Sequence, residues 1–273
     1  MIRLLNCFHI LADPEFLSDD EWREGCSAGN IDTSYIKKTI NASDESALEL
    51  SCRFRDQDAS EECVCLAALT IGDKTNSRIL KTLSAIGFDR TIRIENENVS
   101  GIQRMSSEQT ALIISEWIRK TGEFDIIITG QQSGDGNHGK VPSLIAETLD
   151  ISCITGVTGF TPADKNGAYV SWLSDGTIIR AYVRYPVVLS VGIVSDAYLR
   201  VPTIKQRMAP DQAVTETISA DDFCSDDSMR KREPVLLSME PIVERREAVL
   251  IDGSEADKAA RVMSDKYRKW VAQ

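Results

Sequence analysis

The feature that most constrains this chain is a short apolar run that ends in a glycine-rich turn. Residues 126–129 are three isoleucines and a threonine, and Gly130, Gly134, Gly136 and Gly139 follow closely. An apolar helical pattern begins directly afterwards. A β-branched run favours a strand. Glycines before a helix N-terminus let backbone N–H groups approach a phosphate in a partly positive environment. The stretch therefore predicts a strand, a phosphate-binding turn and a helix at the carboxyl edge of a sheet.

Two alternatives remain open for this stretch. Residues 134–140 nearly match a P-loop, but Val141 stands where a P-loop needs serine or threonine to bind magnesium. This mismatch disfavours a kinase or an ATPase, and the stretch contains no G-x-G-x-x-G dinucleotide fingerprint. The other alternative is an ordinary glycine-rich turn between a strand and a helix that binds no ligand.

Strands and helices alternate along the first part of the chain. Apolar runs of strand length stand at 2–8, 63–71, 91–94 and 125–129. The runs are continuous, which is typical of strands covered on both faces. This order predicts an α/β fold with a Rossmann-like, doubly wound and mostly parallel sheet. Helices are expected from Asn41, from Ser77 to Ile86, from the capping box Ser106-x-x-Gln109 to about Lys120, and after Lys140.

The pattern changes in the second part of the chain. Residues 169–174 and 177–185 are strand-like and are joined by Asp175-Gly176, which predicts an antiparallel hairpin. Residues 186–193 predict one more buried strand. Earlier in the chain, residues 13–40 are polar and irregular and are expected to form a long loop with a hairpin.

The chain is divided after residue 210 into a nucleotide-binding α/β domain, 1–210, and an extended C-terminal arm, 211–273. Residues 211–235 lose apolar periodicity and carry five aspartates, which predicts a linker. A short strand at 249–252 and a basic amphipathic helix from Ser254 follow. The apolar side of that helix has no obvious place within one domain, so we expect it to pack on a partner subunit and the chain alone to be unstable. That side consists of Ala259, Val262, Met263, Tyr267 and Trp270.

Composition excludes several classes of function. The net charge of −11 disfavours nucleic acid and anionic membranes as partners. No apolar run approaches the ~20 residues that span a bilayer. The N-terminus lacks a signal-peptide pattern, which predicts a cytoplasmic protein. Seven irregularly spaced cysteines and two histidines make a metal site or histidine-based catalysis unexpected, so buried reduced thiols are the expectation.

Six segments, in order along the chain, carry a resemblance to a known family. They are 41–49, 85–90, 125–132, 144–149, 185–191 with 201–204, and 252–259. These segments resemble the beta subunits of electron transfer flavoproteins. The resemblance covers nearly the whole length and implies a Rossmann-like fold of the adenine nucleotide alpha-hydrolase type. It also implies pairing with an alpha subunit that carries FAD and shuttles electrons between acyl-CoA-type dehydrogenases and a redox acceptor. In that family the beta subunit binds AMP or, in electron-bifurcating members, a second FAD.

The resemblance further implies a nucleotide site and a docking loop. The family pattern has an AMP-binding and an FAD-binding version of the glycine-rich loop. In the loop after residues 126–129, Gly136 and Val141 match the FAD-binding version, whereas Asn137 and Lys140 match neither version. Residues 193–200 correspond to the loop that docks on a dehydrogenase, and a plain surface connection is the alternative. The implied nucleotide residues are Cys7, Asn41, Thr70, Ile71, Gly72, Asp135, Gly136, Asn137, His138, Gly139, Lys140 and Val141, and the implied docking residues are Ile193 and Leu199.

Two functions are therefore weighed. The first is an electron-carrier subunit that performs no bond chemistry of its own. The second is a stand-alone ATP- or AMP-binding protein or ATPase of the same α/β type. No acid pair, nucleophile–histidine pair or metal cluster in the sequence supports hydrolysis. The sequence favours the carrier and leaves AMP and FAD as alternative ligands.

Overall fold

The structure is a computed structural model in which the chain forms two compact units. The first unit spans residues 1–239 and the second spans residues 240–273. The structure describes residues 1–13, 16–29, 31–57, 63–95, 105–122, 124–209, 214–223, 237–240 and 250–271.

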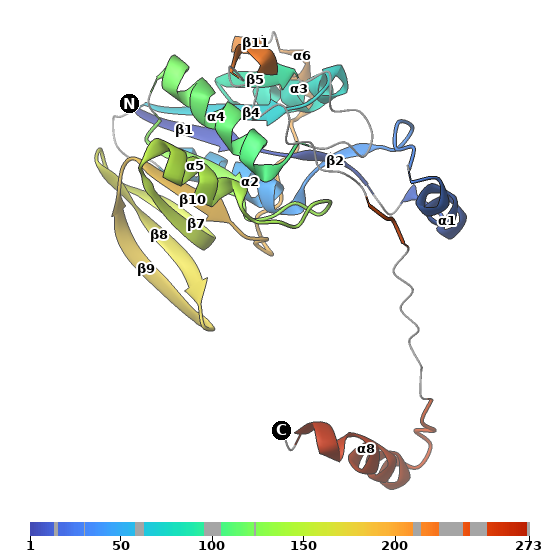
Figure 1. The fold of residues 1–273 in the computed structure, drawn as a ribbon. Coiled ribbons are helices and arrows are strands. Elements are labelled where there is room, and N and C mark those ends of the chain that lie inside the picture. The colour runs from blue at the N-terminus through green and yellow to red at the C-terminus, as the bar shows by residue number, and fades with distance from the viewer. Residues whose placement is uncertain are drawn as a thin grey trace. The chain divides into compact units, whose positions relative to one another are not determined.

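Nine strands within the described residues form the main sheet, in the order β11-β5-β4-β1-β6-β10-β7-β8-β9 (Figure 1). Neighbouring strands from β11 to β7 are parallel, and β8 is antiparallel to both β7 and β9. The predicted Rossmann-like, doubly wound and mostly parallel sheet is thereby confirmed. The strands are β1 Ile2–Cys7, β4 Val64–Ile71, β5 Arg90–Glu95, β6 Ile126–Gly130, β7 Ser152–Asp164, β8 Gly167–Ser174, β9 Thr177–Arg184, β10 Val187–Val191 and β11 Val214–Ser219.

Four helices cover the two faces of the sheet. Because side chains alternate along a strand, Leu4 and Ile128 face one apolar core and Leu5 and Ile127 face the other. The first core contains residues of α2 and α3, and the second contains residues of α4 and α5. Figure 1 shows α4 and α5 on the near face. The helices are α2 Ala42–Gln57, α3 Ser77–Ala85, α4 Ser107–Thr121 and α5 Val141–Leu149.

The strand order reverses next to β1. From β1 the chain moves to β4 and β5 on one side, and it then crosses to β6 and β10 on the other. Parallel α/β sheets bind ligands at such a switch point, outside the carboxyl ends of the strands. The loops that follow β1, β4, β6 and β10 meet at this edge.

Two local signals in the sequence, a helix cap and a hairpin turn, are confirmed by the structure. Ser106 and Gln109 form the expected capping box at the start of α4. Asp175 and Gly176 adopt positive φ angles, 48° and 73°, between the two strands of the hairpin. Such a pair of left-handed residues matches the right-handed twist of a two-residue hairpin.

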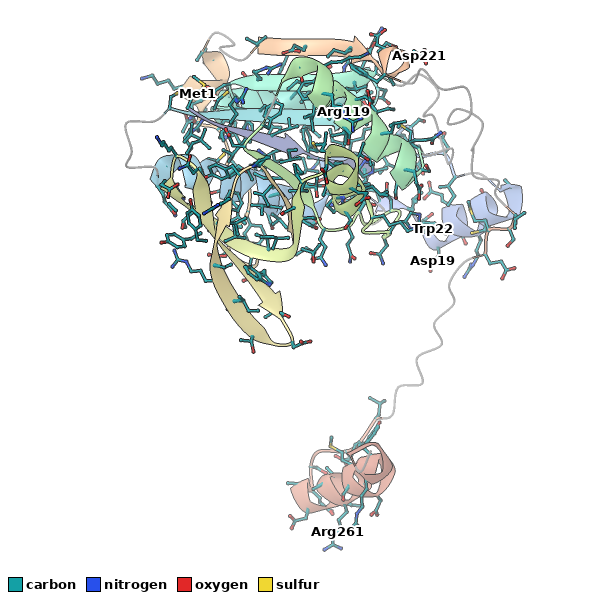
Figure 2. All side chains as sticks on the ribbon, turned by 60° about the vertical axis from the view of Figure 1, so that its left-hand side comes forward. Met1, Asp19, Trp22, Arg119, Asp221 and Arg261 are labelled. Atoms are coloured by element: carbon teal, nitrogen blue, oxygen red, sulfur yellow. The ribbon has the colours of Figure 1, made fainter. Side chains whose placement is uncertain are left out.

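Residues 13–40 were expected to form a long loop with a hairpin. They instead contain α1, Asp19–Ala28, which begins at a capping box formed by Ser18 and Glu21. β3, Lys38–Ile40, pairs in antiparallel orientation with β2, Ile10–Ala12, which precedes this segment, so the two strands do not form a hairpin within residues 13–40. Figure 2 shows Asp19 and Trp22 of α1 at the end of the sheet opposite Met1. Most of α1 is exposed, so it lacks the apolar stripe that identifies a packed helix in a sequence.

The expected linker also requires correction. Residues 214–219 form β11, which pairs in parallel with β5. Arg90 Nη2 lies 2.7 Å from Glu216 Oε1, and the Thr91 and Thr215 hydroxyls lie 3.0 Å apart. β11 is an exposed edge strand fixed by polar pairs, so its sequence carries no apolar run. Residues 224–236 lie outside the described residues.

The second unit contains α8, Ala256–Val271, the helix predicted near the C-terminus. Its apolar residues Val262, Met263 and Tyr267 are exposed within the unit. Residues 250–252 are not a strand, in contrast to the expectation, and residue 249 and the Trp270 side chain lie outside the description. Packing of α8 on a partner remains a prediction. No helix in the described part of the chain is both long and apolar enough to span a bilayer.

Candidate functional site

The carboxyl end of β6 leads into residues 131–140 and then into α5. Residues 131–140 are called the nucleotide loop because the sequence predicts nucleotide binding there. A Cβ on Gly130 would lie 2.6 Å from Asp44 Oδ1, so only glycine fits where the strand ends. Asn137 and Gly139 adopt positive φ angles, 52° and 62°. Pro142 stands in the first turn of α5, where its missing N–H costs no hydrogen bond. The loop thus contains left-handed backbone conformations just before a helix N-terminus.

A buried carboxylate at the start of α2 fastens this edge together. Asp44 Oδ1 accepts a hydrogen bond from Gly130 N at 2.6 Å. Asp44 Oδ2 accepts from His9 N at 3.2 Å and from Asn41 Nδ2 at 2.9 Å. Burial raises the pKa of Asp44, and the three hydrogen bonds oppose that rise. Asp44 therefore connects the ends of β1 and β6 to α2.

Asn41 and Ser43 hold the loop itself. Asn41 Nδ2 and Ser43 Oγ both donate to the carbonyl oxygen of Gln132, at 3.0 and 2.9 Å. Asn41 Oδ1 accepts from Gly134 N at 3.1 Å. Asn41 is buried, and both polar atoms of its amide bind protein groups. Asn41 thus positions the loop, and a direct contact to a nucleotide remains a prediction.

The other sequence-predicted residues gather at the same edge. Cys7 ends β1, and burial, followed by the charge of Asp44, raises the pKa of its thiol. Thr70 and Ile71 end β4, and Gly72 follows them, where a Cβ would collide with Asn76. In the nucleotide loop, Asp135 Oδ2 lies 2.8 Å from His9 Nε2. The structure therefore brings the strand ends and the loop together at the switch point.

Three buried hydroxyls at this edge have no hydrogen-bond partner among the described residues. They belong to Thr70, Thr129 and Ser190, each the next-to-last residue of its strand. Thr129 stands beside both Cys7 and Ser190 in the sheet register. An unsatisfied buried polar group costs about 1–3 kcal/mol and is common at functional sites. The sequence shows only an isolated hydroxyl at the end of each apolar run, which is a weak signal.

Lys140 lies on the exposed side of the loop, near Glu108 of α4. The pKa of Glu108, at the start of α4, is lowered first by local hydrogen bonds at the helix start and then by the nearby Lys140 and His138. Lys140 makes no ion pair with any described residue. An exposed ammonium next to a helix N-terminus is suited to bind an anion.

The predicted docking residues lie beyond β10. Ile193 is 75% exposed, whereas Leu199 is partly buried and packs against the core beside α2. Their participation in docking stays a prediction. Of the two side chains, Ile193 is the one that is exposed.

Cysteine and metal chemistry are limited in the described part of the chain. Its six cysteines are free, and only Cys7 and Cys52 are buried. The expectation of buried thiols thus fails for Cys63, which is exposed, and Cys224 lies outside the description. Among the described residues, no group of three or more histidine, cysteine or acidic side chains is arranged to hold a metal.

Comparison with known proteins decides the family. A sequence model of the electron transfer flavoprotein domain matches residues 29–223. The chain belongs to the electron transfer flavoprotein domain family. It is 28% identical over 274 residues to YgcR of Escherichia coli (strain K12), which is named as an electron transfer flavoprotein subunit, and the match covers 98% of each chain.

Two further relatives agree with this family. The beta subunit of the electron transfer flavoprotein of Bacillus subtilis (strain 168) is 25% identical over 252 residues, which cover 90% of this chain and 92% of the relative. CarD of Acetobacterium woodii, a subunit of the caffeyl-CoA reductase-Etf complex, is 23% identical over 215 residues, or 74% and 78% of the two chains. The chain is therefore an electron transfer protein of a flavin-associated family and is related to the beta subunit.

Proposed function

We propose that this chain is the beta subunit of a cytoplasmic electron transfer flavoprotein. It pairs with an alpha subunit that carries FAD, and the pair shuttles electrons between an acyl-CoA-type dehydrogenase and a redox acceptor. The chain itself binds AMP or a second FAD at the nucleotide loop and catalyses no bond chemistry. Support comes from the family match over residues 29–223 and from the near full-length similarity to a Bacillus beta subunit.

The observation that carries the nucleotide assignment is the loop fixed at the switch point. Asn41, Ser43 and Asp44 use their polar atoms to hold the loop backbone, and residues 138–140 of the loop are exposed to a ligand. Gly136 N and Asn137 N already donate to Ser133 Oγ and Ser133 O. The backbone N–H groups of residues 138–140 and the Lys140 ammonium would therefore bind the phosphate.

The Thr70, Thr129 and Ser190 hydroxyls lie buried at the strand ends beneath this site, without hydrogen-bond partners among the described residues. A bound flavin would supply one- and two-electron redox chemistry. The chain would contribute orientation and exclusion of water.

The test compares two left-handed glycines. Gly139 and Gly176 have φ angles of 62° and 73°, so valine strains the backbone at both positions. Gly139 lies in the nucleotide loop, whereas Gly176 lies in the hairpin turn with open space around it. Each variant is co-expressed with the partner subunit, and released nucleotides are identified by mass spectrometry. We expect Gly139→Val to empty the site and Gly176→Val to retain the nucleotide.

Retention of wild-type nucleotide content by Gly139→Val would contradict the site assignment.

A second variant tests how much the positive charge of Lys140 contributes to nucleotide binding. Lys140→Ala should weaken AMP or FAD binding by about 1–3 kcal/mol, the scale of a charge-assisted hydrogen bond. Because a ligand that binds only the folded state stabilises it, added AMP or FAD should raise the melting temperature of the wild type but not of Gly139→Val.

A further inference from the structure

His9 connects the end of the first strand to the nucleotide loop. It stands two residues after Cys7, the last residue of β1, and its Nε2 atom lies 2.8 Å from Asp135 Oδ2. The His9 side chain is 44% exposed, whereas that of Asp135 is 15% exposed. The carboxylate is therefore largely covered, while the imidazole can exchange protons with the solvent.

The backbone of His9 is fixed independently of its ring. His9 N donates to Asp44 Oδ2 at 3.2 Å, and the His9 carbonyl oxygen accepts from Asn41 N at 3.0 Å. The side chains of Asp44 and Asn41 also hold the end of β6 and the nucleotide loop. The imidazole is thus presented to Asp135 by the same residues that fix the site, and replacement of the ring leaves these backbone contacts in place.

Asp135 stands in a hydrogen-bonded turn of the loop, close to the exposed residues 138–140. Asn137 N donates to Ser133 O across this turn at 2.9 Å. Because each residue extends a chain by at most ~3.6 Å, the Cα atoms of Asp135 and His138 lie within about 11 Å of each other. This distance is comparable to the Debye length of about 10 Å at ~0.1 M salt. A charge on Asp135 therefore acts on an anion bound at residues 138–140.

The protonation state of His9 decides the net charge of the pair. A neutral imidazole with its proton on Nε2 and a protonated imidazole can both donate to a carboxylate. The hydrogen bond therefore exists in both states, and what changes with pH is the charge. The pair is neutral overall when the ring is protonated and carries one negative charge when it is not. Histidine is the side chain whose charge ordinarily changes between about pH 5 and about pH 8.

The charged groups around His9 come from three elements. Two carboxylates contact it among the described residues, Asp135 from the loop and Asp44 from α2. Burial raises the pKa of Asp44, and the charge of His9 is among the effects that oppose this rise. Burial also raises the pKa of the Cys7 thiol, which therefore stays neutral. Lys38 of the adjoining β3 is already in an ion pair, at 2.8 Å.

We propose that His9 is a positioning residue of the nucleotide site, and that loss of its proton weakens the binding of an anionic nucleotide by leaving Asp135 uncompensated beside the phosphate. This inference rests on the proposed function and names a regulation of the same site. A unit charge about 10 Å away, in surroundings between protein and water, changes a binding constant by about threefold at low salt.

The first experiment measures the pH profile of AMP binding to the complete complex with its partner subunit, after bound nucleotide has been removed by dialysis. AMP is the probe because it is also the adenylate half of FAD. His9→Gln keeps an N–H donor for Asp135 but cannot take up a proton. The ratio of its dissociation constant to that of wild type should be about three at about pH 6 and close to one at about pH 8.5. A ratio that does not change with pH would overturn the role of His9.

The ratio isolates His9 from the other ionisations. A phosphate monoester such as AMP loses its second proton near pH ~6, and this change is the same for both proteins. Asp44 and His138 are likewise present in both. Their contributions to the pH profile therefore divide out.

The matched control is His9→Lys, which places a cation at the same position that keeps its proton throughout this pH range. This variant should bind AMP about threefold more tightly than wild type at about pH 8.5 and equally at about pH 6. A merely structural role of the ring would not produce this rescue. An identical pH profile in wild type and His9→Lys would contradict the proposal.

Asp135→Asn tests the other half of the pair and does not depend on the folding of the His9 variants. Removal of the carboxylate should tighten AMP binding by about threefold at about pH 8.5. Asp150→Asn is the control, because Asp150 lies at the opposite end of α5, and it should leave AMP binding unchanged. Unchanged or weaker binding by Asp135→Asn would overturn the assigned effect of its charge.

These outcomes separate the inference from the proposed function. A wild-type complex that binds no AMP at any pH would overturn both the nucleotide site and the role of His9. A wild-type complex that binds AMP with the same pH profile as His9→Gln and His9→Lys would contradict only the role of His9 and leave the site in place.

Discussion

Two buried carboxylates on one helix, Asp44 and Glu49, hold two different loops by different chemistry. Asp44 binds only neutral donors, the backbone N–H groups of Gly130 and His9 and the amide of Asn41. Glu49 binds the guanidinium of Arg200. Burial accordingly raises the pKa of Asp44, while Arg200 lowers the pKa of Glu49.

The difference separates two ways of holding a loop. Asp44 fixes the nucleotide loop and the end of β1 through neutral donors. The ion pair between Arg200 and Glu49 fixes the segment after β10. The two loops also begin side by side, because Gln131 N donates to Val191 O at 2.7 Å. One helix thus organises both loops from a single edge of the sheet.

The largest effect is expected from filling the space beside Asp44. In Gly130→Ala the new Cβ would lie 2.6 Å from Asp44 Oδ1 and 2.8 Å from Asp44 Cγ. Overpacking together with a broken buried hydrogen bond should reduce the free energy of unfolding by about 2–4 kcal/mol. Urea unfolding measures this free energy. Gly159→Ala is the control, because no atom lies within 4 Å of its Cβ position. Equal stability of the two variants would contradict the tight closure.

A smaller loss of stability is expected when one acceptor oxygen of Asp44 is replaced and the shape of the side chain is kept. Asp44→Asn keeps one oxygen, so either Gly130 N or His9 N faces an NH₂ group. We expect a loss of about 1–3 kcal/mol and a weaker hold on AMP or FAD. The control is Asp125→Asn at the other end of β6, where only Oδ2 accepts a backbone hydrogen bond, from Arg3 N at 2.6 Å. Its remaining oxygen can keep that bond. Equal nucleotide loss in both variants would show that Asp44 has no special role.

These contacts show how far the sequence could be used to predict the structure. Strands, helices, the hairpin and the glycine-rich loop were predictable because each depends on neighbouring residues. The hydrogen bond from Gly130 to Asp44 joins residues 86 positions apart, and no local pattern reveals it. Asp44 stood inside the segment 41–49 that carried the resemblance, yet its role emerges only when β6 ends against α2.

The peripheral elements α1 and β11 were not predicted, for a related reason. α1 and β11 are largely exposed and are fixed by a capping box and by polar pairs, so they show no apolar periodicity. Leu199 illustrates the reverse case. Its position in the chain matched a docking loop, and in the structure it is partly buried against the core, while its docking role stays a prediction. Burial is decided by the fold, and the sequence pattern there could not show that Ile193 is exposed and Leu199 partly buried.

The smallest and sharpest effect is the opposite pH dependence of the two carboxylates. The folded pKa of Asp44 is raised above the unfolded value of about 3.8, so between the two values the folded state holds a proton that the unfolded state has lost. The contribution of Asp44 to stability therefore falls as pH rises. The folded pKa of Glu49 is lowered below its unfolded value of about 4.5, so its contribution is complete above that pH and is lost as pH falls through the folded pKa.

Urea unfolding from about pH 3 to about pH 7, without nucleotide, separates the two signs in wild type, Asp44→Asn and Glu49→Gln. The stability advantage of wild type over Glu49→Gln should grow as pH rises, because only wild type gains the ionised Glu49 paired with Arg200. The difference between wild type and Asp44→Asn should change in favour of the variant over the same rise, because the variant has no charge to bury. Two slopes of the same sign would mean that the donors around Asp44 compensate its burial as fully as Arg200 compensates that of Glu49. The contrast between a loop held by neutral donors and a segment held by an ion pair would then have no electrostatic basis.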